Sequence, residues 1–193
     1  MSRKRSFKPR PRPGRAIVIT KELAATRQLE TAIRLWFAHS DPISMLILSY
    51  NAHEIINAMG KTIGKPSEIE SWLKELPPSF QERWKYVNNF CKHAWKDLNE
   101  DTPYDPRQAE ILMYFASRCY RGVFGTNTAL MLAFGFRFLL ENPDLAAAES
   151  DKVLCKLRMV GDPRKVSRQQ SLQDNFAFFS AVVARERPHA GKA

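Results

Sequence analysis

The chain has 193 residues, of which 44% are hydrophobic, enough for one hydrophobic core of ordinary size. Lys and Arg outnumber Asp and Glu by 30 to 20, so the formal net charge is +10 at pH 7. The three cysteines, Cys91, Cys119 and Cys155, are odd in number and form no CxxC pair, so the sequence supports neither a cysteine zinc site nor a disulfide framework and favours a reducing, cytoplasmic setting.

The most apolar stretch covers residues 129–140 and contains Gly135 and Arg137. A helix that spans a bilayer needs about 20 apolar residues, so this stretch predicts a buried helix of a water-soluble domain. The basic N-terminus precedes no hydrophobic region, and we therefore expect no secretory signal and no membrane association.

The positive charge is concentrated at the two ends of the chain. Residues 1–15 carry seven Lys and Arg and no acidic residue, residues 149–193 carry nine against five, and residues 16–148 carry 14 against 15. The N-terminal cations are Arg3, Lys4, Arg5, Lys8, Arg10, Arg12 and Arg15. We expect residues 1–16 to be disordered. Such a tail either neutralises the phosphates of a nucleic acid or only keeps the chain soluble, and the sequence leaves both interpretations open.

Signals for helix starts recur along the chain. Asp41, Asp105 and Asp162 each precede a proline, an arrangement in which Asp caps the free backbone N–H groups and Pro takes the first helical position. Capping boxes begin at Ser67 and Ser79.

Periodicity and these signals together predict eight helices. They cover residues 21–38, 42–59, 68–75, 80–98, 106–122, 127–141, 145–159 and 163–186, with stops at Gly60 and at Asn142–Pro143. The fold class is therefore an all-α bundle of about seven or eight helices, in which short connections make neighbours antiparallel. We expect a tail at 1–16, the bundle at 17–160, and a C-terminal helix with a short basic tail at 161–193.

The predicted helix at 80–98 has two distinct faces. Apolar residues recur at helical spacing on one face, among them Trp84 and Val87. The opposite side carries Lys85, Asn89, Lys92, His93 and Lys96.

Motifs for cofactors and metals are missing: the chain has no GxGxxG, P-loop, HExxH or GxSxG sequence. None of its histidines, His39, His53, His93 and His189, pairs with another at i, i+4. We therefore expect neither a metal site nor a cofactor.

Two histidines lie among polar neighbours. His53, between Ser49 and Asn57, is either a buried histidine bonded to its helix neighbours or one wall of a polar cleft. His93 lies between two lysines, where an imidazole that titrates near neutrality can act as acid or base. The alternative for His93 is a solvated basic helix face without chemistry.

The sequence VNNFCKH at residues 87–93 resembles the signature of the HEPN superfamily of helical nucleotide-binding and RNase domains. That signature is an arginine, usually followed by a polar residue, with a histidine four to six residues further on. Asn89 matches the polar residue and His93 the histidine, whereas Asn88 stands where the family has arginine. Arg34 and His39 also have this spacing, in a helix where the family does not usually carry its motif.

The resemblance implies a dimer in which two His93-bearing faces line a shared cleft, with His93 and Asn89 as catalytic residues of a metal-independent RNase. Because the arginine is replaced, we expect weak cleavage at most. Lys85, Lys92 and Lys96, with the N-terminal cations, would contact RNA or another nucleic acid.

A second hypothesis is a non-catalytic helical adaptor with a protein partner and merely solubilising ends. The last segment, residues 163–187, bears an apolar face that either packs on the same core or docks on a second subunit.

Overall fold

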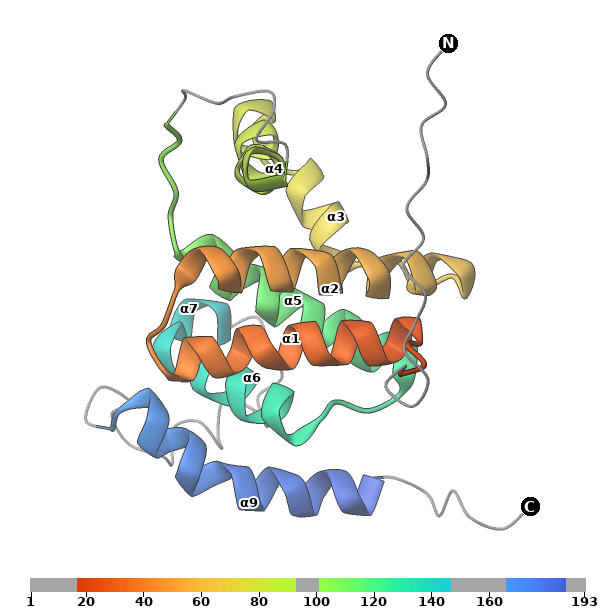
Figure 1. The fold of residues 1–193 in the computed structure, drawn as a ribbon, viewed down its shortest axis with the longest axis vertical. Helices are drawn as coiled ribbons and strands as arrows, with labels where there is room; N and C mark the ends of the chain where they lie inside the picture. The colour runs from red at the N-terminus through yellow and green to blue at the C-terminus, as the bar shows by residue number, and fades with distance from the viewer. Residues whose placement is uncertain (1–16, 93–100, 147–165, 187–193) are drawn as a thin grey trace.

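The computed structural model describes residues 17–92, 101–146 and 166–186 (Figure 1). Within these ranges the chain forms eight helices and no strand, which confirms the all-α prediction. The helices are α1 (Lys21–Phe37), α2 (Pro42–Thr62), α3 (Glu68–Lys74), α4 (Pro78–Lys92), α5 (Arg107–Phe124), α6 (Ala129–Glu141), α7 (Pro143–Ala146) and α9 (Arg168–Glu186). The predicted tail at 1–16 and most of the predicted helix at 145–159 lie outside the described residues.

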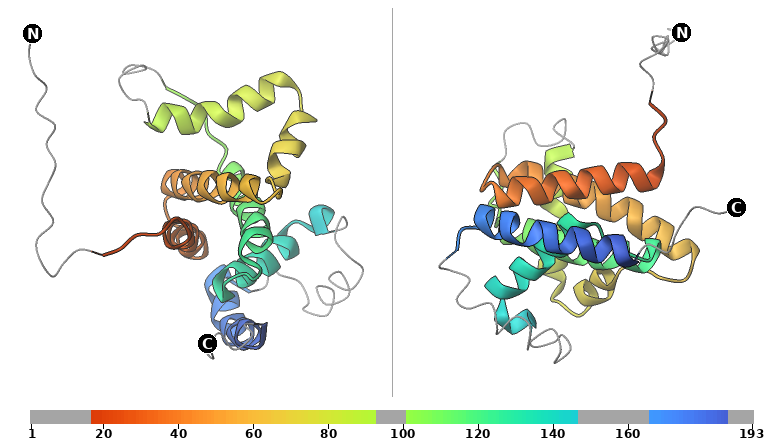
Figure 2. Two further views of the ribbon diagram at one scale, coloured as in Figure 1. Left: turned by 90° about the vertical axis from the view of Figure 1, so that its right-hand side faces the viewer. Right: turned by 90° about the horizontal axis from the view of Figure 1, so that it is seen from below.

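The helices are arranged around α2. A short turn joins α1 to α2, and the two run antiparallel side by side, as a short connection predicts (Figure 1). α5 packs on both, and α6 carries α9 at the end of the molecule opposite α4 (Figure 2). α3 and α4 lie on the side of α2 away from α1, so they form a separate layer that rests on the central helix.

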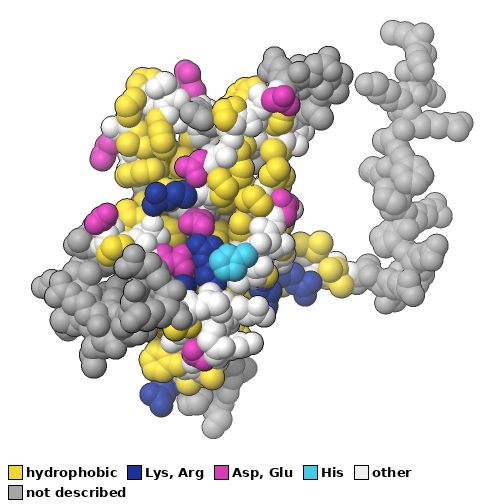
Figure 3. Space-filling view, turned by 90° about the vertical axis from the view of Figure 1, so that its left-hand side faces the viewer, with side chains coloured by type: hydrophobic (Ala, Val, Ile, Leu, Met, Phe, Trp, Pro, Cys, Tyr) yellow, Lys and Arg dark blue, Asp and Glu magenta, His cyan; other side chains and the backbone are white. Residues whose placement is uncertain are grey.

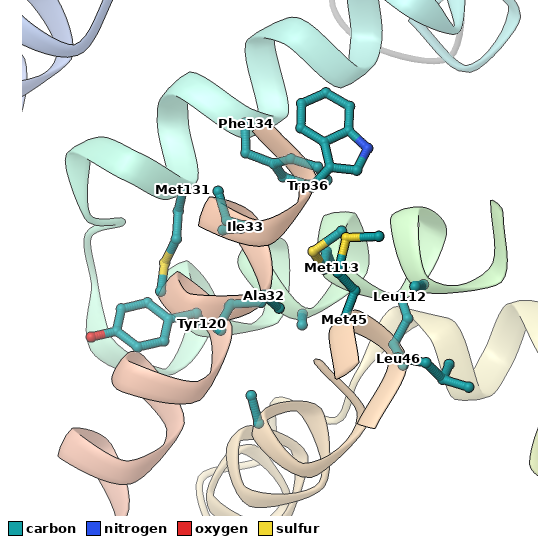
Figure 4. Close-up of a cluster of buried hydrophobic side chains, with 14 of the residues drawn as sticks. Ala32, Ile33, Trp36, Met45, Leu46, Leu112, Met113, Tyr120, Met131 and Phe134 are labelled. Carbon is teal, nitrogen blue, oxygen red and sulfur yellow. The ribbon is translucent and has the colours of Figure 1, made fainter. Parts of the chain in front are cut away.

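The core lies where α1, α2, α5 and α6 meet (Figure 4). Trp36 of α1 meets Phe134 of α6 edge to face, with ring centroids 4.9 Å apart. Met45 of α2 lies beside Met113 of α5. All four side chains are at most 5% exposed. Burying one side chain of this size contributes roughly 1.5–3 kcal/mol, so this cluster fixes the position of α2 and hence of the layer above it.

The predicted start of α2 and the predicted end of α6 are confirmed. Asp41 accepts hydrogen bonds from the N–H groups of Ile43 and Ser44, at 3.3 and 2.9 Å, and Pro42 takes the first helical position. Asn142 ends α6 and donates from its side chain to the carbonyl of Phe138 at 2.8 Å. These local hydrogen bonds satisfy backbone groups that a helix end leaves free.

The prediction that α6 is a buried helix is also confirmed. Leu130, Phe134 and Phe138 are at most 1% exposed, and Arg137 is 5% exposed. Within the described segments, no helix combines the length and the apolar character that crossing a bilayer requires.

The prediction that Gly60 stops its helix is wrong, because α2 continues through it to Thr62. The chain turns back over this point, and the N–H of Lys65 donates to the carbonyl of Gly60 at 2.8 Å. A Cβ at position 60 would collide with the carbonyl oxygen of Lys65. Glycine is required here for close backbone approach within a helix, which is a tertiary constraint.

Neither predicted capping box forms. Ser67 is the N-cap of α3, and its hydroxyl accepts from the N–H of Ile69 at 3.4 Å. Its own N–H, however, donates to the side chain of Asn57 at 2.9 Å, and Glu70 bonds to α2, so the reciprocal half of the box is missing. Ser79 lies inside α4, which begins one residue earlier at Pro78. A proline at a first helical position has its backbone already set for a helix, which explains the earlier start.

The last helix begins at Arg168 rather than at residue 163. Ser167 supplies the cap, because its hydroxyl accepts from the N–H of Gln170 at 3.1 Å. Leu172 and Phe179 pack against the core and Val183 is buried, so this face packs on the same core, as one of the two interpretations held.

A group of charges anchors α9 to the bundle. The guanidinium of Arg168 lies 3.8 Å from the ring centroid of Trp36 and donates to Glu141 at 2.7 Å and to Glu110 at 3.2 Å. Arg137 donates to the same Glu141 at 2.7 Å. Burial raises the pKa of Glu141, but the hydrogen bonds from Arg168 and Arg137 outweigh this effect and lower it.

Candidate nucleic-acid interface

The two faces predicted for the helix at 80–98 are present in α4. Trp84 and Val87 are 5% and 3% exposed and face the bundle, whereas Lys85, Asn89 and Lys92 are exposed. This exposed side of α4, formed by Lys85, Asn89 and Lys92, is termed the α4 surface. Two ammonium groups and an amide about one turn apart form a surface that can bind phosphate oxygens.

The remaining predicted site residues lie outside the described part of the chain. They are His93, Lys96 and the N-terminal cations Arg3, Lys4, Arg5, Lys8, Arg10, Arg12 and Arg15. Of the predicted catalytic pair, the structure therefore describes Asn89 alone, and the pairing with His93 stays a prediction.

The position at which the resembled family has arginine faces inward. Asn88 is 1% exposed, and neither polar atom of its amide has a hydrogen-bond partner within the described residues. An amide buried without a partner costs roughly 1–3 kcal/mol. Because Asn88 is buried and Asn89 is exposed, the two side chains lie on different sides of α4.

The second pair with the family's spacing does not share a helix. Arg34 is exposed on α1, while His39 follows the end of that helix with a φ of 49°. This places His39 on the turn between α1 and α2, not on a helical face with Arg34.

A cavity of about 290 Å³ lies between α2, α3 and α4, with one further contribution from α5. Figure 2 shows how α3 bridges from the end of α2 to the start of α4. Residues of all three helices line the cavity. Its lining combines aromatic, apolar, acidic and basic side chains: Tyr50, His53, Glu54, Glu70, Leu73, Lys74, Gln81, Trp84, Lys85 and Leu112. Lys85 belongs to both the cavity and the α4 surface.

His53 fits both interpretations in part. It is 5% exposed, and its Nε2 lies 2.7 Å from the Ser67 hydroxyl, so its partner comes from the start of α3 rather than from helix neighbours. It also lines the cavity. Burial lowers its pKa to about 4, with an opposing effect of Glu70 and a smaller lowering by Lys61. The imidazole is therefore neutral at physiological pH.

Glu70 joins α3 to α2 beside this histidine. Its Oε1 accepts from the Asn57 amide at 2.7 Å and from the Lys61 ammonium at 2.8 Å. The hydrogen bond from Lys61 lowers the pKa of Glu70 more than burial raises it. The carboxylate is therefore ionised near neutrality, and its Oε2 can accept hydrogen bonds from a ligand.

Tyr50 connects the cavity to the α4 surface. The Lys92 ammonium lies 4.9 Å from the centroid of its ring, a distance typical of a cation–π contact. Burial, with Glu54 and Glu70 nearby, raises the pKa of Tyr50.

On the face of the molecule that Figure 3 shows, positive and negative side chains are interspersed rather than gathered in one basic field. Figure 3 shows one face, on which Lys and Arg lie among Asp and Glu below a largely hydrophobic upper part. Within the described residues, no group of three or more His, Cys, Asp or Glu side chains is placed to hold a metal ion. Burial raises the pKa of the thiols of Cys91 and Cys119, which makes both poor nucleophiles at neutral pH.

Sequence reasoning missed most of the cavity. It identified the polar row on α2 that contains His53, and it identified Lys85, but it interpreted Glu70 as part of a cap and assigned no role to Lys74 or Gln81. The signal that was present is the occurrence of Ser49, His53 and Asn57 at four-residue spacing on an otherwise apolar helix face.

No protein-family model, no curated protein and no solved structure matches this chain.

Proposed function

We propose that the protein binds RNA or another nucleic acid through the α4 surface, as a HEPN-like helical domain. The observation that carries the proposal is the exposure of Lys85, Asn89 and Lys92 on one side of α4, beside a cavity that Lys85 also lines. The ammonium groups are suited to phosphates, and the amide can donate to and accept from sugar or base edges. The cations of residues 1–15 would add contacts that do not depend on sequence.

The binding test uses the full chain, a labelled single-stranded RNA and a series of salt concentrations. We expect the double variant Lys85→Ala/Lys92→Ala to bind more weakly. The slope of log affinity against log salt should become shallower by about 0.7 for each phosphate that the variant no longer neutralises.

The matched control for this test is Lys21→Ala/Arg34→Ala, which removes two exposed cations from α1. It should leave affinity and slope close to those of the wild type. Equally weakened binding by both double variants would contradict a role for the α4 surface and indicate attraction to net charge alone.

The cleavage part of the proposal rests on His93 and Asn89. Because Asn88 replaces the family's arginine, we expect at most weak cleavage of RNA, independent of metal and therefore measurable with chelator present. His93→Ala should abolish it while the melting temperature is retained. Cleavage that persists in this variant would show that His93 is not the catalytic base.

A second candidate, a non-catalytic protein-interaction module, is favoured by apolar side chains exposed on α9 and before α1. Phe178 is 63% exposed, and Val18 is 86% exposed. If this candidate is right, proteins co-purified with the full chain should persist after nuclease treatment and disappear with Phe178→Ser. Retention by Phe178→Ser, or release by nuclease, would argue against it.

A further inference from the structure

The cavity between α2, α3 and α4 has walls suited to a flat ring system. Tyr50 contributes a half-buried aromatic ring and Leu73 contributes half-buried apolar surface, and the almost fully buried Trp84 and Leu112 also line the cavity. Its volume of about 290 Å³ lies just below the range for drug-sized ligand sites, roughly 300–1,000 Å³. These dimensions favour one heterocycle over a larger ligand.

The carboxylates in the cavity are acceptors of hydrogen bonds. Glu54 is exposed beside it, and the amide of Asn57 and the ammonium of Lys61 both donate to Oε1 of Glu70, so that Oε2 can serve a ligand. An ionised carboxylate accepts hydrogen bonds and cannot donate them. His53, neutral and already bonded to Ser67 through Nε2, adds no charge to this wall.

Cations also line the cavity or lie beside it. Lys74 and Lys85 line the cavity, and both are exposed. Lys92 lies against the ring of Tyr50. A ligand that fits all of these groups has a flat ring with hydrogen-bond donors and an attached anion, which describes a nucleotide. The proposed function makes this a nucleotide within a strand.

We propose that this cavity receives one unpaired base of a single-stranded nucleic acid and prefers a base with an exocyclic amino group over uracil. This inference rests on the proposed function and extends it from phosphate contacts to base selection. Cytosine offers an amino group where uracil has a carbonyl oxygen, and that oxygen would face Glu54 or Glu70 at the cost of repulsion. A base must leave its stack to enter a cavity between helices, so duplexes should be poor ligands.

The test compares cytidine and uridine oligonucleotides of the same short length on the full chain. We expect the cytidine oligonucleotide to bind about tenfold more tightly, as one well-placed base contact allows. Glu54→Gln keeps the shape and introduces a donor, so it should shrink this ratio toward one. Because Glu54 is exposed, we expect this variant to fold.

The matched control is Glu82→Gln, an exposed carboxylate on α4 that does not line the cavity. It should keep the full cytidine-over-uridine ratio. Equal affinity of the wild type for both oligonucleotides would overturn the base-selecting cavity and leave the proposed function standing. Failure to bind either oligonucleotide would overturn both.

Discussion

His53 shows how the surroundings of one residue decide its chemistry. Its neighbours in sequence suggest a polar stripe, but three-dimensional packing buries the ring and gives it a hydroxyl partner from the start of α3. Burial disfavours the imidazolium, which explains the lowered pKa of about 4. His53 is therefore unsuited to act as a general base that titrates near neutrality.

The lowered pKa of His53 predicts how stability depends on pH. The unfolded chain gains a proton on this residue below about pH 6.5, and the folded chain only below about pH 4, so stability falls as pH is lowered through that window. We expect the free energy of unfolding to drop by about 2 kcal/mol between pH 7 and pH 5 from this group. Urea denaturation at both pH values measures the drop, and His53→Gln should reduce it. An unchanged drop in this variant would mean that other groups are responsible.

The close backbone contact at Gly60 lets us predict how one added methyl group changes the stability of the protein. Gly60→Ala should destabilise the protein by about 1–3 kcal/mol, because the added Cβ collides with the Lys65 carbonyl oxygen and the backbone must shift. Gly135→Ala is the control: it also lies within a helix, with nothing within 4 Å of the added Cβ. It should be neutral or stabilise by up to about 1 kcal/mol. Thermal or urea unfolding of both variants distinguishes the two outcomes.

Among the elements, α9 and α4 differ in how they are attached to the central bundle. α9 is held by packing on α6 and by Arg168, which stacks on Trp36 and bonds to two carboxylates. α4 rests on α2 and α3 through Trp84, whose ring meets Trp72 with centroids 5.8 Å apart. Gln108 of α5 also donates to the backbone carbonyl of Trp84 at 2.6 Å. Aromatic contacts and this hydrogen bond therefore position α4, whereas hydrogen bonds of Ser67 and Glu70 attach α3 to α2.

Because Glu141 bonds to two arginines where α9 meets the bundle, we predict that removing its charge lowers the stability of the protein. Glu141→Gln should destabilise the protein by about 3 kcal/mol, because the buried Arg137 and the half-buried Arg168 lose the negative charge they share. Hydrogen exchange should rise first in α9. Asp174→Asn, at an exposed position of α9, is the control and should change little. Unchanged exchange in α9 for Glu141→Gln would show that apolar packing alone holds the helix.

At the scale of the whole molecule, a nearly neutral body lies between basic ends. Residues 16–148 carry 14 Lys and Arg against 15 Asp and Glu, so long-range attraction of a polyanion must come from the termini. In the proposed function, the termini attract the nucleic acid and the α4 surface orients it.

This division of charge predicts the effect of removing residues 1–15. Deletion should weaken nucleic-acid binding and flatten its salt dependence, by roughly 0.7–0.9 in log–log slope for each phosphate that the tail had neutralised. The cytidine-over-uridine ratio should be retained, since the cavity remains. Binding titrations at several salt concentrations provide the measurement. A slope unaffected by the deletion would show that these cations do not bind phosphates.

The sequence by itself determined the fold class and the positions of most helices. Caps such as Asp41 and the apolar periodicity of the helices are local, since they depend on residues within one or two turns, and such signals survive in any tertiary context. The exposed side of α4 followed from the same periodicity. Tertiary structure decided the rest: Gly60 stays helical because a distant carbonyl approaches it, and Glu70 bonds to α2 instead of capping α3. Residues of α2, α3, α4 and α5 line the cavity, and no pattern along the chain encodes which helix faces will meet there.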